Sequence, residues 1–239
     1  FSDGGKFDSL DAALFHAEEM VNQGADILDV GGESTRPGHI QITEDEEIAR
    51  VTPVIEQLKK RFDVPVSIDT YKSRVAEAAL QAGADLVNDI WGLKYDENMA
   101  EVIARHQAAC CLMQNREQID YTDYVEDVLD DLRESVQIAK AAGIPDDRIM
   151  LDPGVGFGKT YEMNLEIIRV VGRLKELGYP VLLGTSRKSV IGLTLDLPAD
   201  QREEGTLVTT VLGVEQGCSF VRVHDVETNA RAIRMAEAI

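Results

Sequence analysis

The sequence predicts an α/β fold, a (β/α)8 TIM barrel, on two observations. Short apolar runs alternate with amphipathic helical stretches along the whole chain, a pattern that indicates a parallel sheet joined by right-handed crossovers. The joint between helix and strand also recurs, as QGADILDV, AGADLVND and QGCSFVRV. Seven such strands are one fewer than a closed barrel has. We therefore expect a barrel whose first strand is largely missing from the sequence given; a doubly wound open sheet is the alternative.

The individual elements follow from the apolar pattern. The expected strands are residues 25–30, 65–68, 84–87, 109–113, 149–151, 181–183 and 219–223. Apolar spacing of three and four predicts helices over residues 12–22, 44–61, 72–81, 124–142 and 165–177. Ser9 and Asp123 are placed to cap helices, and five glycines follow helix ends, at Gly24, Gly83, Gly143, Gly178 and Gly217. No Pro/Ser-rich linker interrupts the series, so residues 1–239 are expected to form a single domain.

Composition limits the classes of function. The 239 residues are 44% hydrophobic and 28% charged, as in a soluble globular protein, and no apolar run approaches the ~18 residues of a membrane span. The formal net charge of −19 argues against binding to nucleic acid or to an anionic membrane surface. The three cysteines stand in apolar runs without CxxC spacing, which favours buried thiols of a reduced, cytoplasmic protein. An anionic ligand would need the scarce cations gathered locally.

Polar side chains follow the predicted strands, at the carboxyl ends where barrels of this kind carry their function. Asp69, Asn88 and Asp152 could either cap the next helix or pair with the N–H groups of a flat, nitrogen-rich heterocycle. Arg222 and His224 are two residues apart on one predicted strand, so they face the same side and favour anion binding. The cations at strand ends are Arg36, Arg116, Lys159, Arg187, Lys188, Arg222 and His224.

Two loops and one strand end add weaker signals. Residues 31–38, GGESTRPG, form either a solvated turn or a mobile loop that brings Thr35 and Arg36 to a substrate. Residues 152–159, DPGVGFGK, are glycine-rich without the spacing of a P-loop, so phosphate binding and close loop packing both remain open. The stretch 181–189, VLLGTSRKS, ends a strand in hydroxyl groups and cations. No cluster of histidine and glutamate is present, so a tightly held zinc or iron ion is not expected.

As a set, these stretches resemble the dihydropteroate synthase family, the folate-pathway enzymes that sulfonamide drugs inhibit. The stretches occur in the family's order: FSDGG (1–5), DVGGESTRPG (29–38), SIDT (67–70), VND (87–89), LDPGVGFGK (151–159), GTSRKS (184–189) and RVHDV (222–226). GESTRPG and TSRKS are specific individually. The resemblance implies a (β/α)8 barrel that joins p-aminobenzoate to 7,8-dihydropterin-6-ylmethyl diphosphate, giving 7,8-dihydropteroate and diphosphate.

The resemblance also implies residue roles. The pterin pocket would comprise Asp69, Asn88, Asp152 and Lys188, lined by Met113, Phe157 and Gly184. Arg222 and His224 would bind the diphosphate, and with Asp69 and Lys188 they would form the catalytic set. The p-aminobenzoate site would comprise Ser186, Thr35, Arg36 and Pro37, with Phe1 approaching it from a loop. Arg187 receives no role.

Partners and cofactor follow from the same resemblance. Mg²⁺ is the expected cofactor, although the family's usual asparagine ligand precedes FSDGG, so no metal ligand is expected within the sequence given. Gln114 stands where many members have histidine. A homodimer packed through outer helices and inhibition by sulfonamides are implied. The alternatives are a domain that passes a methyl group from methyltetrahydrofolate to a corrinoid protein, which needs no diphosphate site, and a non-catalytic pterin-binding barrel.

Overall fold

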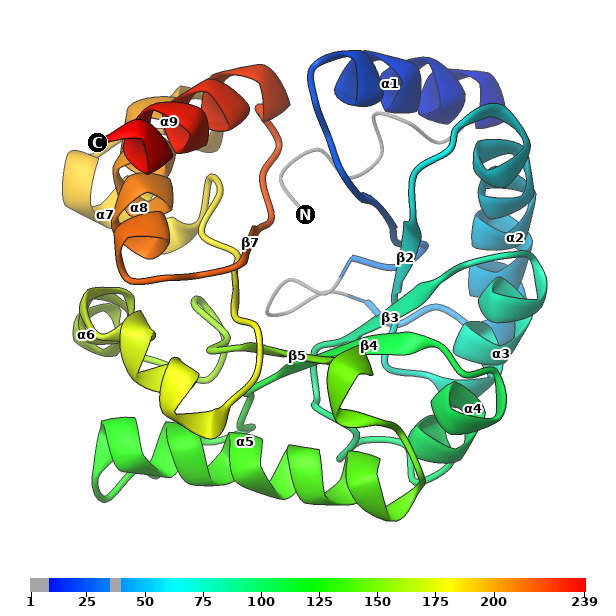
Figure 1. Ribbon diagram of the computed structural model, residues 1–239, viewed down its shortest axis with the longest axis horizontal. Helices are drawn as coiled ribbons and strands as arrows, with labels where there is room; N and C mark the ends of the chain where they lie inside the picture. The colour runs from blue at the N-terminus through cyan, green and yellow to red at the C-terminus, as the bar shows by residue number, and fades with distance from the viewer. Residues whose placement is uncertain (1–8, 35–39) are drawn as a thin grey trace.

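The computed structural model describes residues 9–34 and 40–239, and it confirms the α/β barrel architecture. Five parallel strands form one sheet in chain order: β1 (Leu28–Val30), β2 (Val66–Asp69), β3 (Leu86–Asp89), β4 (Ala109–Met113) and β5 (Ile149–Asp152). A second parallel pair, β6 (Leu182–Leu183) and β7 (Phe220–Val221), continues the order, because Leu151 of β5 forms a bridge with Val181. The strands therefore follow one another around the centre of the ring in Figure 1.

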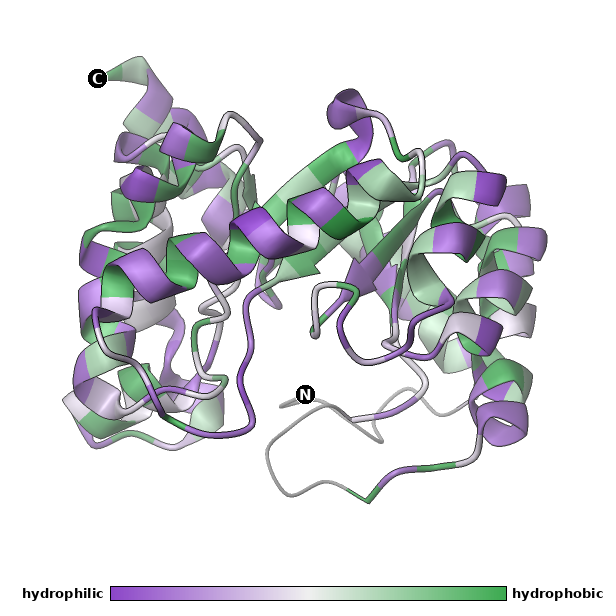
Figure 2. Ribbon diagram, turned by 90° about the horizontal axis from the view of Figure 1, so that it is seen from below, coloured by the Kyte–Doolittle hydropathy of each residue, from purple (hydrophilic) through white to green (hydrophobic). Residues whose placement is uncertain are grey.

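The helices lie outside the strands (Figure 1). They are α1 (Leu10–Asn22), α2 (Glu44–Arg61), α3 (Ser73–Gln81), α4 (Met99–Arg105), α5 (Tyr124–Ala141), α6 (Tyr161–Arg169), α7 (Ser189–Leu195), α8 (Glu203–Glu215) and α9 (Val226–Ala238). Short 3-10 segments accompany them: η1 (Asp146–Arg148), η2 (Val171–Leu177) and η3 (Ala199–Gln201). Hydrophilic and hydrophobic residues alternate along the helices in Figure 2, as amphipathic helices over a core require.

The single helix predicted over residues 165–177 is wrong. Helix α6 ends at Arg169 and η2 begins at Val171. The cause is the side chain of Gln216, whose Nε2 donates to the Ile168 carbonyl (3.0 Å) while its Oε1 accepts from the Gly172 N–H (3.1 Å). These are the two backbone groups that an α-helix would pair with each other. A side chain from the end of α8 thus interrupts the helix.

The predicted helix ends are mostly confirmed. Ser9 Oγ accepts a hydrogen bond from the Ala12 N–H at the start of α1. The five glycines after helix ends all adopt positive φ, between 83° and 110°, a region in which other residues are strained. Asp123 occupies the N-cap position of α5, but its side chain makes no capping hydrogen bond, so the predicted cap is wrong in that respect.

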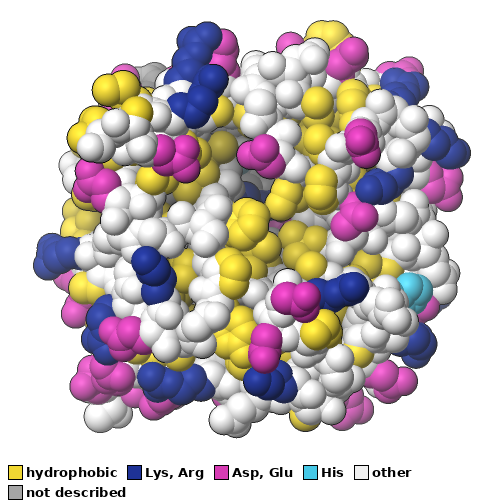
Figure 3. Space-filling view, viewed as in Figure 1, with side chains coloured by type: hydrophobic (Ala, Val, Ile, Leu, Met, Phe, Trp, Pro, Cys, Tyr) yellow, Lys and Arg dark blue, Asp and Glu magenta, His cyan; other side chains and the backbone are white. Residues whose placement is uncertain are grey.

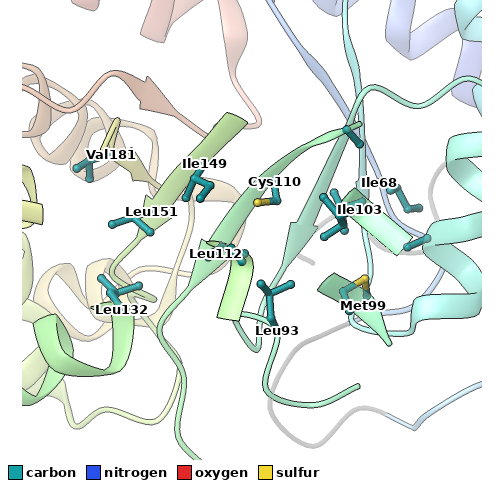
Figure 4. Packing of buried hydrophobic residues seen from close by; sticks show 14 of the residues in the cluster. Ile68, Leu93, Met99, Ile103, Cys110, Leu112, Leu132, Ile149, Leu151 and Val181 are labelled. Carbon is teal, nitrogen blue, oxygen red and sulfur yellow. The ribbon is translucent and has the colours of Figure 1, made fainter. Parts of the chain in front are cut away.

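Alternate residues of each strand enter two separate cores. Ile68, Val87, Leu112 and Leu151 belong to the large buried cluster between strands and helices. Figure 4 shows part of it, with strand residues packed beside Met99 and Ile103 of α4 and Leu132 of α5. Residues of the opposite parity pack inside the barrel, in a small cluster of Leu86, Cys111 and Met150 with Ala109, Leu182 and Phe220 around it. The second set defines the inward face of β3 to β7, and the strand register extends that face to Ser67 of β2 and Asp29 of β1.

Side chains rather than backbone pairing connect the two edge strands. Within residues 9–34 and 40–239, no strand pairing joins β7 to β1. The guanidinium of Arg222, just after β7, reaches Asp29 of β1 instead. A Cβ on Gly24, at the end of α1, would lie 3.8 Å from that of Ala230 in α9. An eighth strand ahead of Phe1 stays a prediction.

The remaining general expectations concern thiols and membranes. Cys110 and Cys111 are buried and Cys218 is half-buried, and all three are free thiols. Among the described helices, none is long and apolar enough to cross a membrane. Basic and acidic side chains are interspersed over the face of the molecule drawn in Figure 3.

Candidate active site

The strand register gathers the predicted pterin residues at one end of the barrel. Asp69 lies opposite Asn88, and Met113 lies opposite Asp152. All four have the parity of the inward face and are at least nine-tenths buried. β2, β3 and β5 run one or two residues further than expected, so Asp69, Asn88 and Asp152 belong to the strands themselves. Their positions are therefore set by sheet geometry.

The inward-facing residues Asp69, Asn88, Met113 and Asp152 are hereafter the pterin row. Arg222 connects this row to a carboxylate that the sequence did not single out, Asp29. Its Nε lies 2.7 Å and its Nη2 2.6 Å from Asp29 Oδ2, and Nη2 also lies 3.0 Å from Asp69 Oδ2. Among the described residues, the buried Oδ1 atoms of Asp29 and Asp69 have no hydrogen-bond partner. Asp29 could have been found from strand alternation, because it is the polar residue of β1, between Leu28 and Val30.

The predicted strand over residues 219–223 is too long, since β7 ends at Val221. The Arg222 N–H nevertheless donates to the Leu183 carbonyl (3.1 Å), so the backbone stays in register for one more residue. That bond directs the Arg222 side chain toward β1 and β2, where Asp29 and Asp69 lie.

Burial dominates the electrostatics of the row. It raises the pKa of Asp69 to about 7, with Arg222 opposing the rise and Asp29 adding to it. Burial likewise raises the pKa of Asp152, against the attraction of Lys188. Burial lowers the pKa of Lys188 to about 8, although Asp152 opposes the change. The site therefore contains one carboxyl group, Asp69, and one amine, Lys188, whose protonation changes near neutral pH.

Lys188 and Phe157 form one wall of the site. Lys188 Nζ donates to the Val155 carbonyl at 2.5 Å and lies 5.0 Å from the centroid of the Phe157 ring. Phe157 belongs to a buried apolar cluster with Tyr71, Ile90 and Met113, and Trp91 packs against it. An apolar wall beside buried hydrogen-bonding groups suits a flat heterocycle.

Gly184 lies close to the side chains of both Asp152 and Lys188. A Cβ at this position would lie 3.8 Å from Asp152 Oδ2 and 3.8 Å from Lys188 Nζ. Glycine therefore leaves open the space between a carboxylate and an ammonium that a ligand would contact.

Lys159 holds the loop that contains Phe157 through hydrogen bonds to Gln114 and to the Phe157 carbonyl. Its Nζ lies 2.5 Å from Gln114 Oε1 and 3.0 Å from the Phe157 carbonyl. Gln114 Nε2 in turn donates to Asp131 Oδ2 at 2.8 Å. Burial lowers the pKa of Lys159 to about 7. Gln114 thus has a defined structural role, in holding the glycine-rich loop.

Ser186 and His224 contact each other. Ser186 Oγ lies 2.8 Å from His224 Nδ1 and accepts from the His224 N–H at 3.2 Å. The hydroxyl expected at the p-aminobenzoate site therefore also orients the imidazole expected at the diphosphate site.

Two of the strand-end cations, Arg187 and Arg116, form ion pairs with aspartates of other elements. Arg187 forms a two-pronged ion pair with Asp225, at 2.6 and 3.2 Å. Arg116 binds Asp131 in the same way, at 2.7 and 3.0 Å. Each of these two arginines thus has an aspartate partner within the protein, and the charge of Arg222 is likewise paired, with Asp29 and Asp69. Phe1, Thr35, Arg36 and Pro37 lie outside the described residues.

Comparisons with known proteins agree with this geometry. Residues 1–224 match the family described as pterin binding enzyme. The chain is 58% identical to a dihydropteroate synthase of Clostridium beijerinckii, over all of this chain and 89% of the relative, and 54% identical to that of Bacillus subtilis, over all of this chain and 84% of the relative. A Clostridium difficile dihydropteroate synthase solved in the presence of pteroic acid superposes with a TM-score of 0.95 at 54% identity, covering 100% of this chain and 91% of that one. The Yersinia pestis enzyme with a sulfonamide drug superposes with a TM-score of 0.97 at 39% identity, covering 100% and 89%. The chain belongs to the pterin-binding enzymes and, within them, to the dihydropteroate synthase family.

Proposed function

We propose that this protein condenses 7,8-dihydropterin-6-ylmethyl diphosphate with p-aminobenzoate, giving 7,8-dihydropteroate and diphosphate. One observation carries the proposal: a buried row of hydrogen-bonding groups, Asp69, Asn88 and Asp152, ends beside the cations Lys188 and Arg222. A pterin ring needs such a row of donors and acceptors, and its diphosphate substituent needs cations.

The carboxylates would select and orient the ring. Ionised Asp152 and Asp69 can each accept N–H groups from the pterin, while the Asn88 amide both donates and accepts. Lys188 would donate to the ring rather than remove a proton. Burial already desolvates the Lys188 ammonium and lowers its pKa. Little further desolvation therefore occurs when the pterin ring covers this group.

The diphosphate would leave from the Arg222 side of the site. The carbon–oxygen bond breaks with its electron pair staying on the diphosphate, and the exocyclic carbon is left positive and delocalised into the pterin. Arg222 and His224 stabilise the developing negative charge, while Asp69 favours positive charge on the pterin. Arg222 keeps its fixed position through Asp29 and Asp69, so it need not be oriented during the reaction.

The amine completes the exchange. The neutral amino group of p-aminobenzoate attacks the exocyclic carbon, a carbon–nitrogen bond forms, and the amine releases a proton. No covalent enzyme nucleophile is required, and exclusion of water protects the cation from hydrolysis. Ser186, Thr35, Arg36, Pro37 and Phe1 are the residues proposed for the p-aminobenzoate site.

Mg²⁺ is proposed as the cofactor from the family resemblance. Among the described residues there is no group of three or more His, Cys, Asp or Glu side chains that could hold a metal ion. Mg²⁺ is commonly held by only one or two carboxylates together with substrate phosphates, so the ion would be bound together with the diphosphate rather than at a preformed site of the protein alone. Activity measured with Mg²⁺, and after EDTA is added in excess, tests the requirement.

Assembly, inhibitors and location are also proposals. Apolar side chains of α7 and α8, among them Leu193, Val208 and Leu212, are exposed, which supports a homodimer through outer helices; sedimentation tests it. The sulfonamide complex of the Yersinia pestis relative supports inhibition by that class. The three free thiols support a reducing, cytoplasmic location.

The decisive experiment supplies full-length protein with Mg²⁺, the pterin diphosphate and p-aminobenzoate. We expect dihydropteroate to form and diphosphate to be released only when p-aminobenzoate is present. No release, or release indifferent to p-aminobenzoate, would refute the proposal. Methyl transfer from methyltetrahydrofolate to a corrinoid protein is not favoured, because that reaction has no use for Arg222 and His224 as a diphosphate site.

A further inference from the structure

Two side chains that take no part in the chemistry above hold the loop of residues 153–158, hereafter the Phe157 loop. The first is Lys159, whose Nζ donates to the Phe157 carbonyl at 3.0 Å and to Gln114 Oε1 at 2.5 Å. Gln114 is 2% exposed, and its Nε2 donates to Asp131 Oδ2 of α5 at 2.8 Å. Lys159 thus joins the Phe157 loop to the end of β4 and, through Gln114, to α5.

The second side chain is that of Asn164, in the first turn of α6. Its Oδ1 accepts from the Gly156 N–H at 2.6 Å, and its Nδ2 donates to the Thr160 carbonyl at 2.8 Å. Because the amide donates to Thr160 through its nitrogen, its oxygen is the atom that faces the Phe157 loop. Asn164 therefore holds the middle of the loop from the side of α6.

Backbone packing leaves the Phe157 loop little freedom to shift. A Cβ on Gly154 would lie 1.9 Å from the Gln114 carbonyl oxygen, and a Cβ on Gly158 would lie 2.5 Å from the Arg116 carbonyl oxygen. Both glycines have positive φ, 71° and 54°, which other residues rarely adopt. The glycines permit this close approach to the segment after β4, and the two side chains hold it.

Three contacts connect the Phe157 loop to the groups assigned to the pterin. The Gly154 N–H donates to Asp152 Oδ1 at 2.7 Å. The Val155 carbonyl accepts from Lys188 Nζ at 2.5 Å. The Phe157 ring centroid lies 5.0 Å from the same ammonium. The position of the loop therefore determines how one carboxylate, one ammonium and one apolar ring are presented to a ligand.

Stability alone does not explain a lysine at position 159. Both hydrogen-bond acceptors of its Nζ are neutral oxygens, and burial lowers the pKa of Lys159 to about 7. A methionine would fill a similar space without this desolvation cost. The ammonium does act on the pterin row: burial raises the pKa of Asp152, and the charges of Lys188 and Lys159 oppose that rise. Lys159 therefore favours the ionised carboxylate that would accept pterin N–H groups.

We propose that Lys159 and Asn164 are positioning residues for the pterin: they hold the Phe157 loop in the arrangement that the pterin ring fits. The inference rests on the proposed function, which assigns the groups contacted by this loop to the pterin. None of the residues proposed for p-aminobenzoate belongs to the loop, so the affinity for that substrate should not depend on Lys159 or Asn164.

The test compares two variants of the full-length protein with a matched control. Lys159→Met keeps the length of the side chain but removes its charge and its donors. Asn164→Leu keeps the size of the side chain but removes the acceptor for the Gly156 N–H. The control is Lys140→Met, which removes an ammonium 3.1 Å from Asp146 Oδ1. That ion pair lies where the chain leads from α5 into β5, whereas the pterin row lies where β5 ends.

Calorimetric titration with the pterin diphosphate, in the absence of p-aminobenzoate, measures the pterin affinity without turnover. The Kd should rise about tenfold in Lys159→Met, which loses hydrogen bonds from a charged group, and about fivefold in Asn164→Leu, which loses a neutral one. Lys140→Met should bind as wild type does. KM for p-aminobenzoate should stay within about twofold of wild type in all three variants.

Other outcomes would overturn the inference. Variants that lose thermal stability but keep the wild-type Kd would show that both side chains serve the fold alone. An equal rise in the pterin Kd and in KM for p-aminobenzoate would indicate a general disturbance of the site. If one variant fails to fold, the Kd of the other decides. A wild type that binds the pterin diphosphate but forms no dihydropteroate would refute the proposed function, while the Kd values would still decide the inference.

Discussion

Replacing Asp29 with asparagine should shift the pH dependence of catalysis toward acid. The pKa of Asp69 is about 7, against an ordinary value of 3.8, because burial raises it, Arg222 lowers it and Asp29 raises it. Asp29→Asn removes a negative charge from beside Asp69 and leaves Asp69 as the charged partner of Arg222. Both changes lower the pKa of Asp69, and together they should lower it by about one unit.

The sign of the effect on activity follows from the role of Asp69. An ionised Asp69 is needed to accept pterin N–H groups and to favour the cation, so kcat/KM rises as pH rises through its pKa. In wild type we expect the acid limb near pH 7 and a fall above about 8, where Lys188 loses its proton. In Asp29→Asn the acid limb should move to lower pH and the optimum should broaden.

The assay is kcat/KM for the pterin diphosphate against pH, at saturating p-aminobenzoate. Asp225→Asn is the matched control, because it also removes an aspartate from an arginine, Arg187, without a contact to Asp69. An acid limb that stays in place in Asp29→Asn, or that moves to higher pH, would refute the reasoning.

Three further results are expected. Gly154→Ala should lower the free energy of unfolding, measured by urea titration, by more than about 3 kcal/mol and should reduce activity. The reasons are that φ is 71° and that the new Cβ would lie 1.9 Å from the Gln114 carbonyl oxygen. The control Gly143→Ala, which has open space around it, should cost only about 1–2 kcal/mol. Lys188→Met should weaken pterin binding about 10- to 100-fold by calorimetry, and an unchanged Kd would remove Lys188 from the pocket. Leu132→Ala, in the helix-facing core, should cost about 2–5 kcal/mol with unchanged KM values; altered KM values would contradict the separation of core and site.

Alternation along the strands made most of the site predictable. Asp69, Asn88 and Asp152 stand directly after short apolar runs. A parallel sheet brings such positions to one edge, and this does not depend on the length or sequence of the helices that connect the strands. The order of strands and the glycines after helices are equally local signals, and both are confirmed.

What could not be predicted depends on partners remote in the chain. Nothing near Arg116 or Arg187 in sequence shows that Asp131 and Asp225 neutralise them, since those partners come from other elements. The break after α6 depends on Gln216, 44 residues beyond Gly172. Local propensity favours one helix there, and a tertiary hydrogen bond overrides it.

The ion pair between Arg222 and Asp29 joins residues separated by 193 positions. During synthesis, at about 5–20 residues per second, β1 leaves the ribosome about 10–40 s before its counter-ion exists. Until then, the two carboxylates that Arg222 binds, Asp29 and Asp69, have no guanidinium to balance them, and closing so long a loop carries an entropic cost. The pocket is therefore among the last parts of the molecule to mature, and a nascent chain gains its ligand affinity only when its final strand arrives.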